Sequence, residues 1–289
     1  MSKKIKLKTL DEVTIRFAGD SGDGMQLSGG RFTQTSAIVG NDLSTLPDFP
    51  AEIRAPAGSL AGVSSFQIHF SSHEIHTPGE EPDVLVAMNP AALKVHLEEL
   101  VPGGILIVNK NAFTKKNLKF AGYESDPTED GSLDDYYSVH YIEMSKLVTN
   151  ACEGLDLPSK TVERTKNLCA LGVLFWMYDR PLEPTLDWLN KKFKSKPLII
   201  DANTRALHAG YNYGDTAEIF TTRYVVKKAS LAPGKYRNIN GTLASCLGIL
   251  TASVSYTHLR AHETPEHRVF RVMVEKKKWG GGGGGGGGG

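Results

Sequence analysis

The residues best suited to chemistry lie in a short glycine-rich stretch, GDSGDG, at positions 19–24. The segment before it alternates apolar and polar residues like a strand, and the segment after it carries apolar or small residues at helical spacing. A glycine-rich turn between a strand and a helix exposes backbone N–H groups that can bind a phosphate or another anion. Gly22, Asp23 and Gly24 are therefore candidate binding residues. The alternative is a tight turn that needs glycine for its backbone conformation alone.

The spacing of this turn bears on two other classes of site. It is G-x-x-G-x-G, which differs from the G-x-G-x-x-G of dinucleotide-binding turns, so a nicotinamide or flavin site is disfavoured. The letters GDSG also surround the nucleophile of chymotrypsin-like serine proteases. In that family the histidine precedes the serine, whereas every histidine of this chain follows Ser21. The sequence therefore favours an anion site over a hydrolase or a dinucleotide site.

A second candidate lies in the loop FPAEIRAPAGSLAG at positions 49–62. Its arginine, Arg54, has a planar guanidinium that can hold a phosphate or a carboxylate through paired hydrogen bonds. The competing interpretation is a surface or interdomain salt bridge between Arg54 and Glu52.

Histidine and cysteine offer little for a metal site. His73 and His76 are three residues apart, but a third ligand is not evident and a solvated loop is favoured. The cysteines Cys152, Cys169 and Cys246 are far apart and odd in number, which is typical of free thiols in a reducing compartment. An iron–sulfur cluster held by this chain alone would usually need four thiolates. Cys169 lies in an apolar segment and is predicted to fill the core.

The elements that would position these residues alternate between strand and helix. Strands are predicted at residues 12–18, 63–70, 83–88, 104–108 and 137–144, and helices at 25–40, 90–100, 160–178, 184–193 and 196–208. Nearly continuous apolar runs such as DVLVAM suit strands buried on both faces of a parallel sheet. The polar segment 110–135 is predicted to be a surface excursion. The pattern predicts an α/β fold, with a Rossmann-like, mainly parallel sheet flanked by helices.

Charge and hydrophobicity narrow the classes of partner. The chain carries 33 lysine and arginine residues against 32 aspartate and glutamate residues, so a nucleic-acid partner is not expected. Its basic start is not followed by the apolar core of a signal peptide, and no apolar run approaches the length of a transmembrane helix. We therefore expect no membrane partner and a cytoplasmic location.

Domain organisation follows from changes in composition. Residues 1–226 are predicted to form the α/β domain, residues 227–240 an extended linker, and residues 241–254 the first helix of a second domain. Residues 255–289 resemble translated sequencing-adapter sequence followed by a homopolymer read error, and we interpret them as a non-native tail. The alternative is a natural basic tail with a flexible glycine linker. The second domain is thus predicted to be cut off just after it starts.

Several segments together resemble a known family. They are FAGDSGDGMQLSGG, FPAEIRAPAGSLAGVSSFQIHF, DVLVAMNPAAL, RTKNLCALGVLFWMYDRPLEP and ANTRALHAGYNYGDTAE. They resemble the gamma domain of the 2-oxoacid:ferredoxin oxidoreductases, and more narrowly the 2-oxoglutarate type, in which gamma and alpha domains are fused in one alpha subunit. The resemblance covers about residues 12–252. Many gamma domains have G-x-G-G-Q-G and E-x-R-G-G-like stretches, where this chain has GDSGDG and EIRAPAG.

The resemblance implies an oxidative decarboxylation of a 2-oxoacid, with thiamine diphosphate, an iron–sulfur cluster, coenzyme A and ferredoxin taking part. In this family the beta subunit supplies the cluster and most thiamine contacts, and the alpha domain completes the thiamine site. The gamma domain covers the site and contacts coenzyme A, which would assign Gly22, Asp23, Gly24 and Arg54 to that contact. The fragment alone is expected to bind none of these cofactors and to be inactive. A free-standing nucleotide-binding module and a non-catalytic assembly subunit remain the alternatives.

Overall fold

The computed structural model describes residues 6–52, 55–217 and 220–251. Its contacts divide the chain into two compact units, Met1–Pro233 and Gly234–Gly289. The described part of the second unit contains one helix, α9 (Gly241–Thr251), where a helix was predicted. Residues 227–240 form neither helix nor strand. The assignment of the two units to gamma and alpha domains stays a prediction, and residues 255–289 lie outside the described residues.

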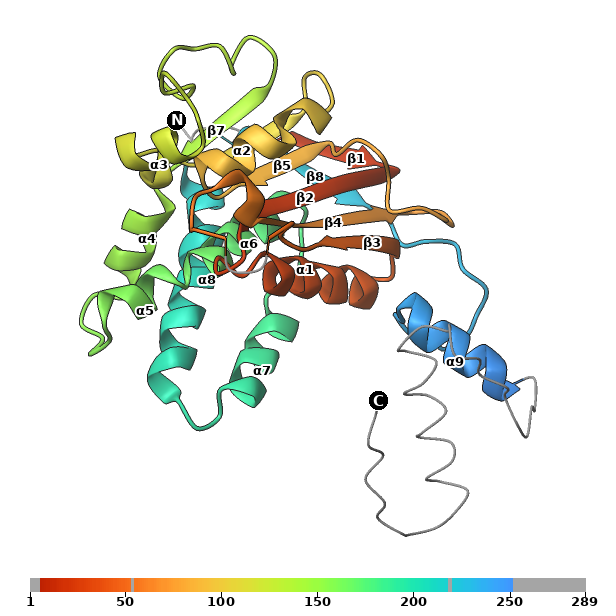
Figure 1. The fold of residues 1–289 in the computed structure, drawn as a ribbon. Coiled ribbons are helices and arrows are strands. Elements are labelled where there is room, and N and C mark those ends of the chain that lie inside the picture. The colour runs from red at the N-terminus through yellow and green to blue at the C-terminus, as the bar shows by residue number, and fades with distance from the viewer. Residues whose placement is uncertain (1–5, 53–54, 218–219, 252–289) are drawn as a thin grey trace, which may run out of the picture. The chain divides into compact units, whose positions relative to one another are not determined.

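The first unit is built on a six-stranded sheet (Figure 1). In spatial order its strands are β3 (Asp42–Asp48), β4 (Val63–Ser71), β2 (Glu12–Asp20), β5 (Val84–Ala87), β6 (Ile105–Asn109) and β7 (Ser138–Ile142). Strand β4 runs antiparallel to both of its neighbours, and the pairs from β2 to β7 are parallel. The predicted α/β fold with a mainly parallel sheet is confirmed.

A small second sheet consists of β1 (Lys6–Leu10) and β8 (Thr222–Val226), which pair in parallel. Neither strand was predicted, and β3 was missed as well. The residues of β1, β3 and β8 are mostly exposed or half-exposed, so apolar and polar residues do not alternate clearly along these segments. Pairing with strands that are distant in the sequence therefore determines their conformation.

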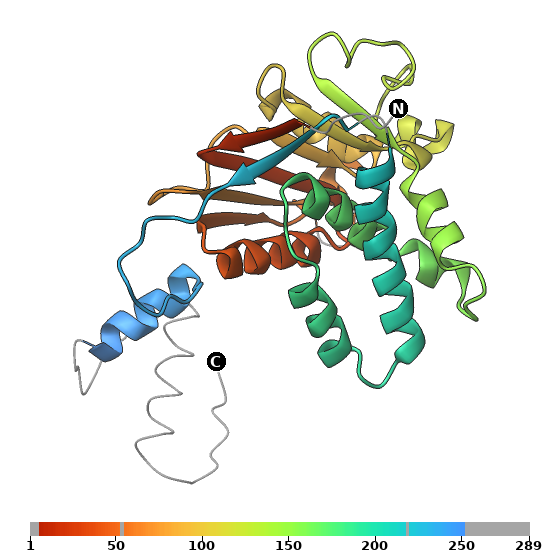
Figure 2. The ribbon, with the colours of Figure 1, turned by 180° about the vertical axis from the view of Figure 1, so that it is seen from behind.

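Helices cover both faces of the large sheet (Figures 1 and 2). One face carries α1 (Met25–Val39) and α6 (Lys166–Met177), with α8 (Pro197–Thr216) packed on α6, and the other carries α2 (Pro90–His96), with α3 (Lys115–Phe120) packed on α2. Strand β5 shows how this arises, because its residues alternate between two cores. Val84 and Val86 belong to the core under α1 and α6, whereas Leu85 and Ala87 belong to the core under α2.

Helices α6 and α8 approach each other closely because each has a glycine at the contact. A Cβ atom on Gly172 would lie 2.2 Å from the carbonyl oxygen of Leu207, and one on Gly210 would lie 1.9 Å from that of Cys169. Cys169 is fully buried there, and burial raises the pKa of its thiol to about 12. The prediction that Cys169 fills the core is confirmed.

The predicted helical segment 160–178 is wrong in one respect, because it is two helices, α5 (Ser159–Glu163) and α6. At the break, the hydroxyl of Thr165 donates to the carbonyl oxygen of Val162 over 2.7 Å. Such a local side-chain bond competes with regular helix bonding. The break matters for function, since it brings Arg164 and Lys166 to the glycine-rich turn.

Three other helical features differ from the sequence prediction. The predicted helix 196–208 continues to the end of α8, with small residues facing α6. The unpredicted helix α4 (Met144–Ala151) packs against α6 and α8. The excursion 110–135 contains α3 and buries Leu118 and Leu133, so it is partly anchored in the second core. Helix α7 (Glu183–Lys192) lies within a residue of its predicted position.

Candidate functional site

The glycine-rich turn lies where the sheet changes its winding direction (Figure 1). Strand β2 enters α1, which leads to β3 on one side, while the adjacent parallel strand β5 enters α2, which leads to β6 on the other. Ligands of open α/β sheets bind in the crevice at such a point, beyond the carboxyl ends of the strands. The sheet therefore presents the turn at a position suited to a ligand.

The two predicted site glycines play different parts. Gly24 caps α1 in the left-handed region, with φ 77°, and a Cβ atom there would lie 2.4 Å from Nδ2 of Asn167. Backbone conformation and space both require glycine at this position. A Cβ on Gly22 would meet no atom within 4 Å. Gly24 is therefore structural, whereas Gly22 faces open space.

That open space is a cavity of about 390 Å³, which we call the glycine-turn cavity. It is bounded by the turn, by the loop at residues 55–62 and by the start of α5 and α6. Its charged lining residues are Asp20, Asp23, Lys160, Glu163, Arg164 and Lys166. Arg54 lies outside the described residues, and its neighbour Ala55 lines the cavity.

Asp23 is held by other groups of the protein. One carboxylate oxygen lies 3.1 Å from Nζ of Lys166, and the other accepts the backbone N–H of Asp20 over 3.0 Å. Lys166 also lies 3.4 Å from Glu163. Burial alone would lower the pKa of Lys166, but these carboxylates outweigh it and raise that pKa. This geometry favours a positioning role for Asp23, because an ionised carboxylate repels a phosphate.

Asp20 forms the acidic wall of the cavity. Its Oδ2 accepts the N–H of Gly58 over 2.9 Å, and its Oδ1 is buried without a hydrogen-bond partner in the described structure. Burial, and then the nearby charge of Asp23, raise the pKa of Asp20. The protonated form of Asp20 is thus favoured relative to that of an exposed aspartate.

Two cations of the cavity have no ion-pair partner among the described residues. Lys160 and Arg164 form no ion pair with any described residue, whereas Lys166 is shared between carboxylates. No histidine or cysteine is among the described lining residues. The arrangement can therefore attract and hold an anion, but its described part supplies no nucleophile paired with a base.

The three cations Lys160, Arg164 and Lys166 were not predicted from the sequence as site residues. They are far from the turn in the chain and meet it only through tertiary packing. A signal existed, because these charged residues lie at or just before the start of α6, which is apolar and almost entirely buried. The charged residues at this position mark the end of the buried apolar segment, where the N-terminus of α6 meets the crevice.

The remaining sequence candidates do not join this site. His73 contacts Ser71 Oγ over 2.8 Å and lies 3.4 Å from Glu12, away from the cavity lining. Within the described ranges, no group of three or more histidine, cysteine, aspartate or glutamate residues is arranged to hold a metal ion. Across the same ranges, no helix has the length and apolar character needed to span a bilayer.

Comparison with known proteins gives consistent results. The family described as pyruvate ferredoxin/flavodoxin oxidoreductase matches residues 14–213. The chain is 50% identical over 277 residues to the 2-oxoglutarate oxidoreductase subunit KorA of Mycobacterium tuberculosis, which covers 91% of this chain and 42% of that relative. The chain thus spans less than half the length of this relative.

Two solved structures share the fold. The 2-oxoglutarate:ferredoxin oxidoreductase of Magnetococcus marinus matches with a TM-score of 0.68 and 22% identity, over 94% of this chain and 43% of that one. The gamma subunit of a keto/oxoacid ferredoxin oxidoreductase from Geobacter sulfurreducens matches with a TM-score of 0.50 and 17% identity, over 72% and 99%. With the family match across most of the first unit, the predicted resemblance is confirmed: the chain belongs to the pyruvate ferredoxin/flavodoxin oxidoreductase family.

Proposed function

We propose that this chain is the N-terminal part of the alpha subunit of a 2-oxoglutarate:ferredoxin oxidoreductase. That enzyme would decarboxylate the 2-oxoacid, join the acyl group to coenzyme A and pass the electrons to ferredoxin. The observation that carries the proposal is the 50% identity to a 2-oxoglutarate oxidoreductase subunit over nearly the whole chain. The required partner is a beta subunit, which would complete the active site.

Within this enzyme, the glycine-turn cavity would contact coenzyme A. Coenzyme A carries several phosphate charges, and the cavity offers Lys160 and Arg164 without ion-pair partners in the described structure. Gly22 leaves room for close approach to the backbone. Arg54 would add a further cation from the adjoining loop. The Magnetococcus marinus structure carries coenzyme A and succinyl-CoA, which supports a coenzyme A role for a protein of this fold.

In this proposal the chain's own residues bind and position the substrate. Lys160 and Arg164 hold phosphate, while Asp23 fixes Lys166 and the turn. Thiamine diphosphate and an iron–sulfur cluster would supply the decarboxylation and electron-transfer chemistry from other parts of the complex. The described residues do not fit a cluster, because Cys152 and Cys169 are buried and neither lines the cavity.

The test is reduction of a viologen dye by the complete alpha subunit co-expressed with its beta subunit. We expect reduction that requires both 2-oxoglutarate and coenzyme A, with pyruvate a poorer substrate. A complex that contains its thiamine diphosphate and cluster but reduces no dye with any 2-oxoacid would contradict the proposal. That result would favour an assembly subunit or a nucleotide-binding module. Activity with pyruvate alone would keep the reaction class and change the substrate.

A further inference from the structure

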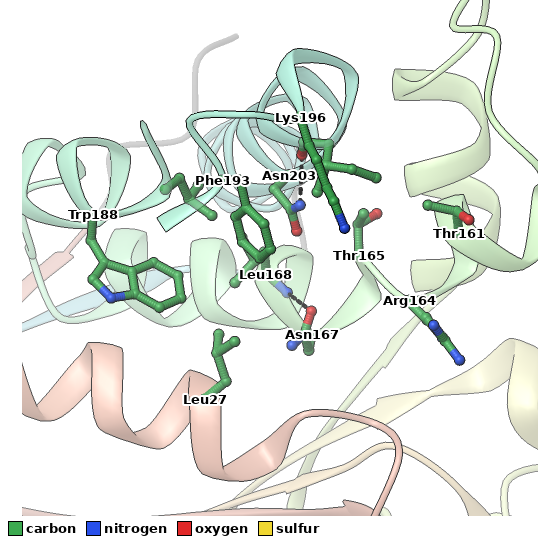
Figure 3. A pocket seen from close by; sticks show the side chains of 12 residues that line it. Leu27, Thr161, Arg164, Thr165, Asn167, Leu168, Trp188, Phe193, Lys196 and Asn203 are labelled. Atoms are coloured by element: carbon green, nitrogen blue, oxygen red, sulfur yellow. Dashed lines mark hydrogen bonds between the residues drawn. The ribbon is translucent and has the colours of Figure 1, made fainter. Parts of the chain in front are cut away.

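A second cavity, of about 300 Å³, lies among α1, α6, α7 and α8 (Figure 3). We call it the aromatic cavity. Six of its lining residues define it: Leu27, Leu168, Trp188, Phe193, Lys196 and Asn203. Its size is at the lower end of the range of small-molecule pockets, about 300–1,000 Å³. It therefore suits a ligand much smaller than coenzyme A.

One wall of this cavity is aromatic. The rings of Trp188 and Phe193 pack edge to face, with centroids 6.3 Å apart and planes at 86°. Two cations make cation–π contacts with the ring of Trp188. The guanidinium of Arg31 lies 4.4 Å and the ammonium of Lys192 lies 4.6 Å from its centre. Leu27 from α1 borders the same space. A flat apolar group would find a preformed surface here.

The other wall is polar. In Figure 3 the side chain of Lys196 extends into the cavity toward Asn203 and Thr165. Lys196 forms no ion pair within the described ranges, so its charge is available to a ligand. The side-chain nitrogen of Asn203 donates to the carbonyl oxygen of Ile199 over 2.6 Å, which fixes its orientation. This wall can bind one acid group.

The surrounding charge favours an anion. The segment KKFKSK at residues 191–196 contains four lysines and no acidic residue. Of these four lysines Lys196 lines the cavity, and the other three add positive charge to the same segment, which raises the local concentration of anionic ligands. The cavity therefore combines an apolar wall and a polar wall with a nearby excess of positive charge.

We propose that the aromatic cavity binds a small organic acid with a flat apolar body. The acid group lies at Lys196, and the flat part lies against Trp188 and Phe193. The proposal does not rest on the function proposed above, because the two cavities share one cation, Arg164, and otherwise use different side chains.

Isothermal titration calorimetry on the 289-residue chain tests the proposal, with 2-naphthoate and the uncharged 2-naphthamide as probes. We expect 2-naphthoate to bind about tenfold more tightly than 2-naphthamide, because Lys196 can give the carboxylate a charge-assisted hydrogen bond; tenfold corresponds to about 1.4 kcal/mol. Lys196→Gln should remove this preference, and Trp188→Leu should weaken both probes. Lys191→Gln is the matched control, an exposed lysine of the same segment outside the cavity lining, and should change neither.

Two outcomes would overturn the proposal. Equal affinity for the acid and the amide would show that no charge is recognised. Equal weakening by Lys191→Gln and Lys196→Gln would show general attraction to a basic surface. Lys196 is exposed, so its variant is expected to fold, and circular dichroism verifies this for Trp188→Leu. Failure here would leave the viologen assay unaffected, and failure of that assay would leave these titrations interpretable.

Discussion

The glycine-turn cavity and the aromatic cavity are built in opposite ways. The first depends on the backbone conformation of the turn and on the ion pairs of Lys166 with Asp23 and Glu163. The second depends on side chains from several helices, and its described lining contains no acidic side chain. The glycine-turn cavity therefore requires a particular residue at a few positions, such as Gly24. In the aromatic cavity the contribution to binding is spread over many side chains.

The two cavities are nevertheless connected through Asn167. Its side-chain amide lies against Gly24 at the turn, and the same residue lines the aromatic cavity. The oxygen of this amide accepts the N–H of Leu168 over 2.8 Å, which fixes its orientation. A change at Gly24 should therefore affect both cavities, whereas changes at the charged residues other than the shared Arg164 should affect one.

The largest effect is expected for Gly24→Ala. Alanine in the left-handed region adds strain of about 1–3 kcal/mol, and displacing Asn167 adds a packing cost. We expect the free energy of unfolding to fall by about 2–4 kcal/mol in urea denaturation. Gly30→Ala is the matched control, since its Cβ meets no atom within 4 Å and α1 should gain up to about 1 kcal/mol. Similar midpoints for both variants would disprove the structural role of Gly24.

This contrast also marks how far the sequence could predict the molecule. Strand β2, the turn and α1 follow from local patterns, and so does the mainly parallel sheet. The local pattern around Gly22 and Gly24 does not distinguish a structural glycine from one facing the cavity, because the difference depends on Asn167 in another helix. The cations at the start of α5 and α6 were missed for the same reason. Long-range packing, here set by the break at Thr165, determines which charges reach the turn.

Lys166→Met should have the second largest effect. It leaves Asp23 and Glu163 without their shared cation in a half-buried position, and we expect a loss of about 1–3 kcal/mol in urea denaturation. Binding of 2-naphthoate should stay unchanged. The exposed pair Lys146–Glu143 has the same 3.1 Å separation, and Lys146→Met should cost less than about 0.5 kcal/mol. Equal losses would show that burial of the pair contributes nothing.

Asp20→Asn should change how stability depends on pH. The raised pKa of Asp20 means that its stabilising contribution is present below its ordinary value of 3.8 and is lost as pH rises through the folded-state value. The variant should therefore gain stability over the unmodified chain as pH rises from about 4 toward neutrality. Asp130 is a control of opposite sign, because hydrogen bonds from Ser132 lower its pKa. A pH-independent difference for Asp20→Asn would refute the raised pKa.

The smallest effect on stability, and the most specific effect on function, is expected for Gly22→Ala. Its methyl group would enter open space in the glycine-turn cavity, so the free energy of unfolding should change by no more than about 0.5 kcal/mol. In the complete complex, the KM for coenzyme A should rise while the KM for 2-oxoglutarate stays constant, because the added group occupies the space proposed for coenzyme A. An unchanged KM for coenzyme A would place that substrate away from the turn. Lys160 and Arg164, which have no ion-pair partner among the described residues, would then need another anionic ligand.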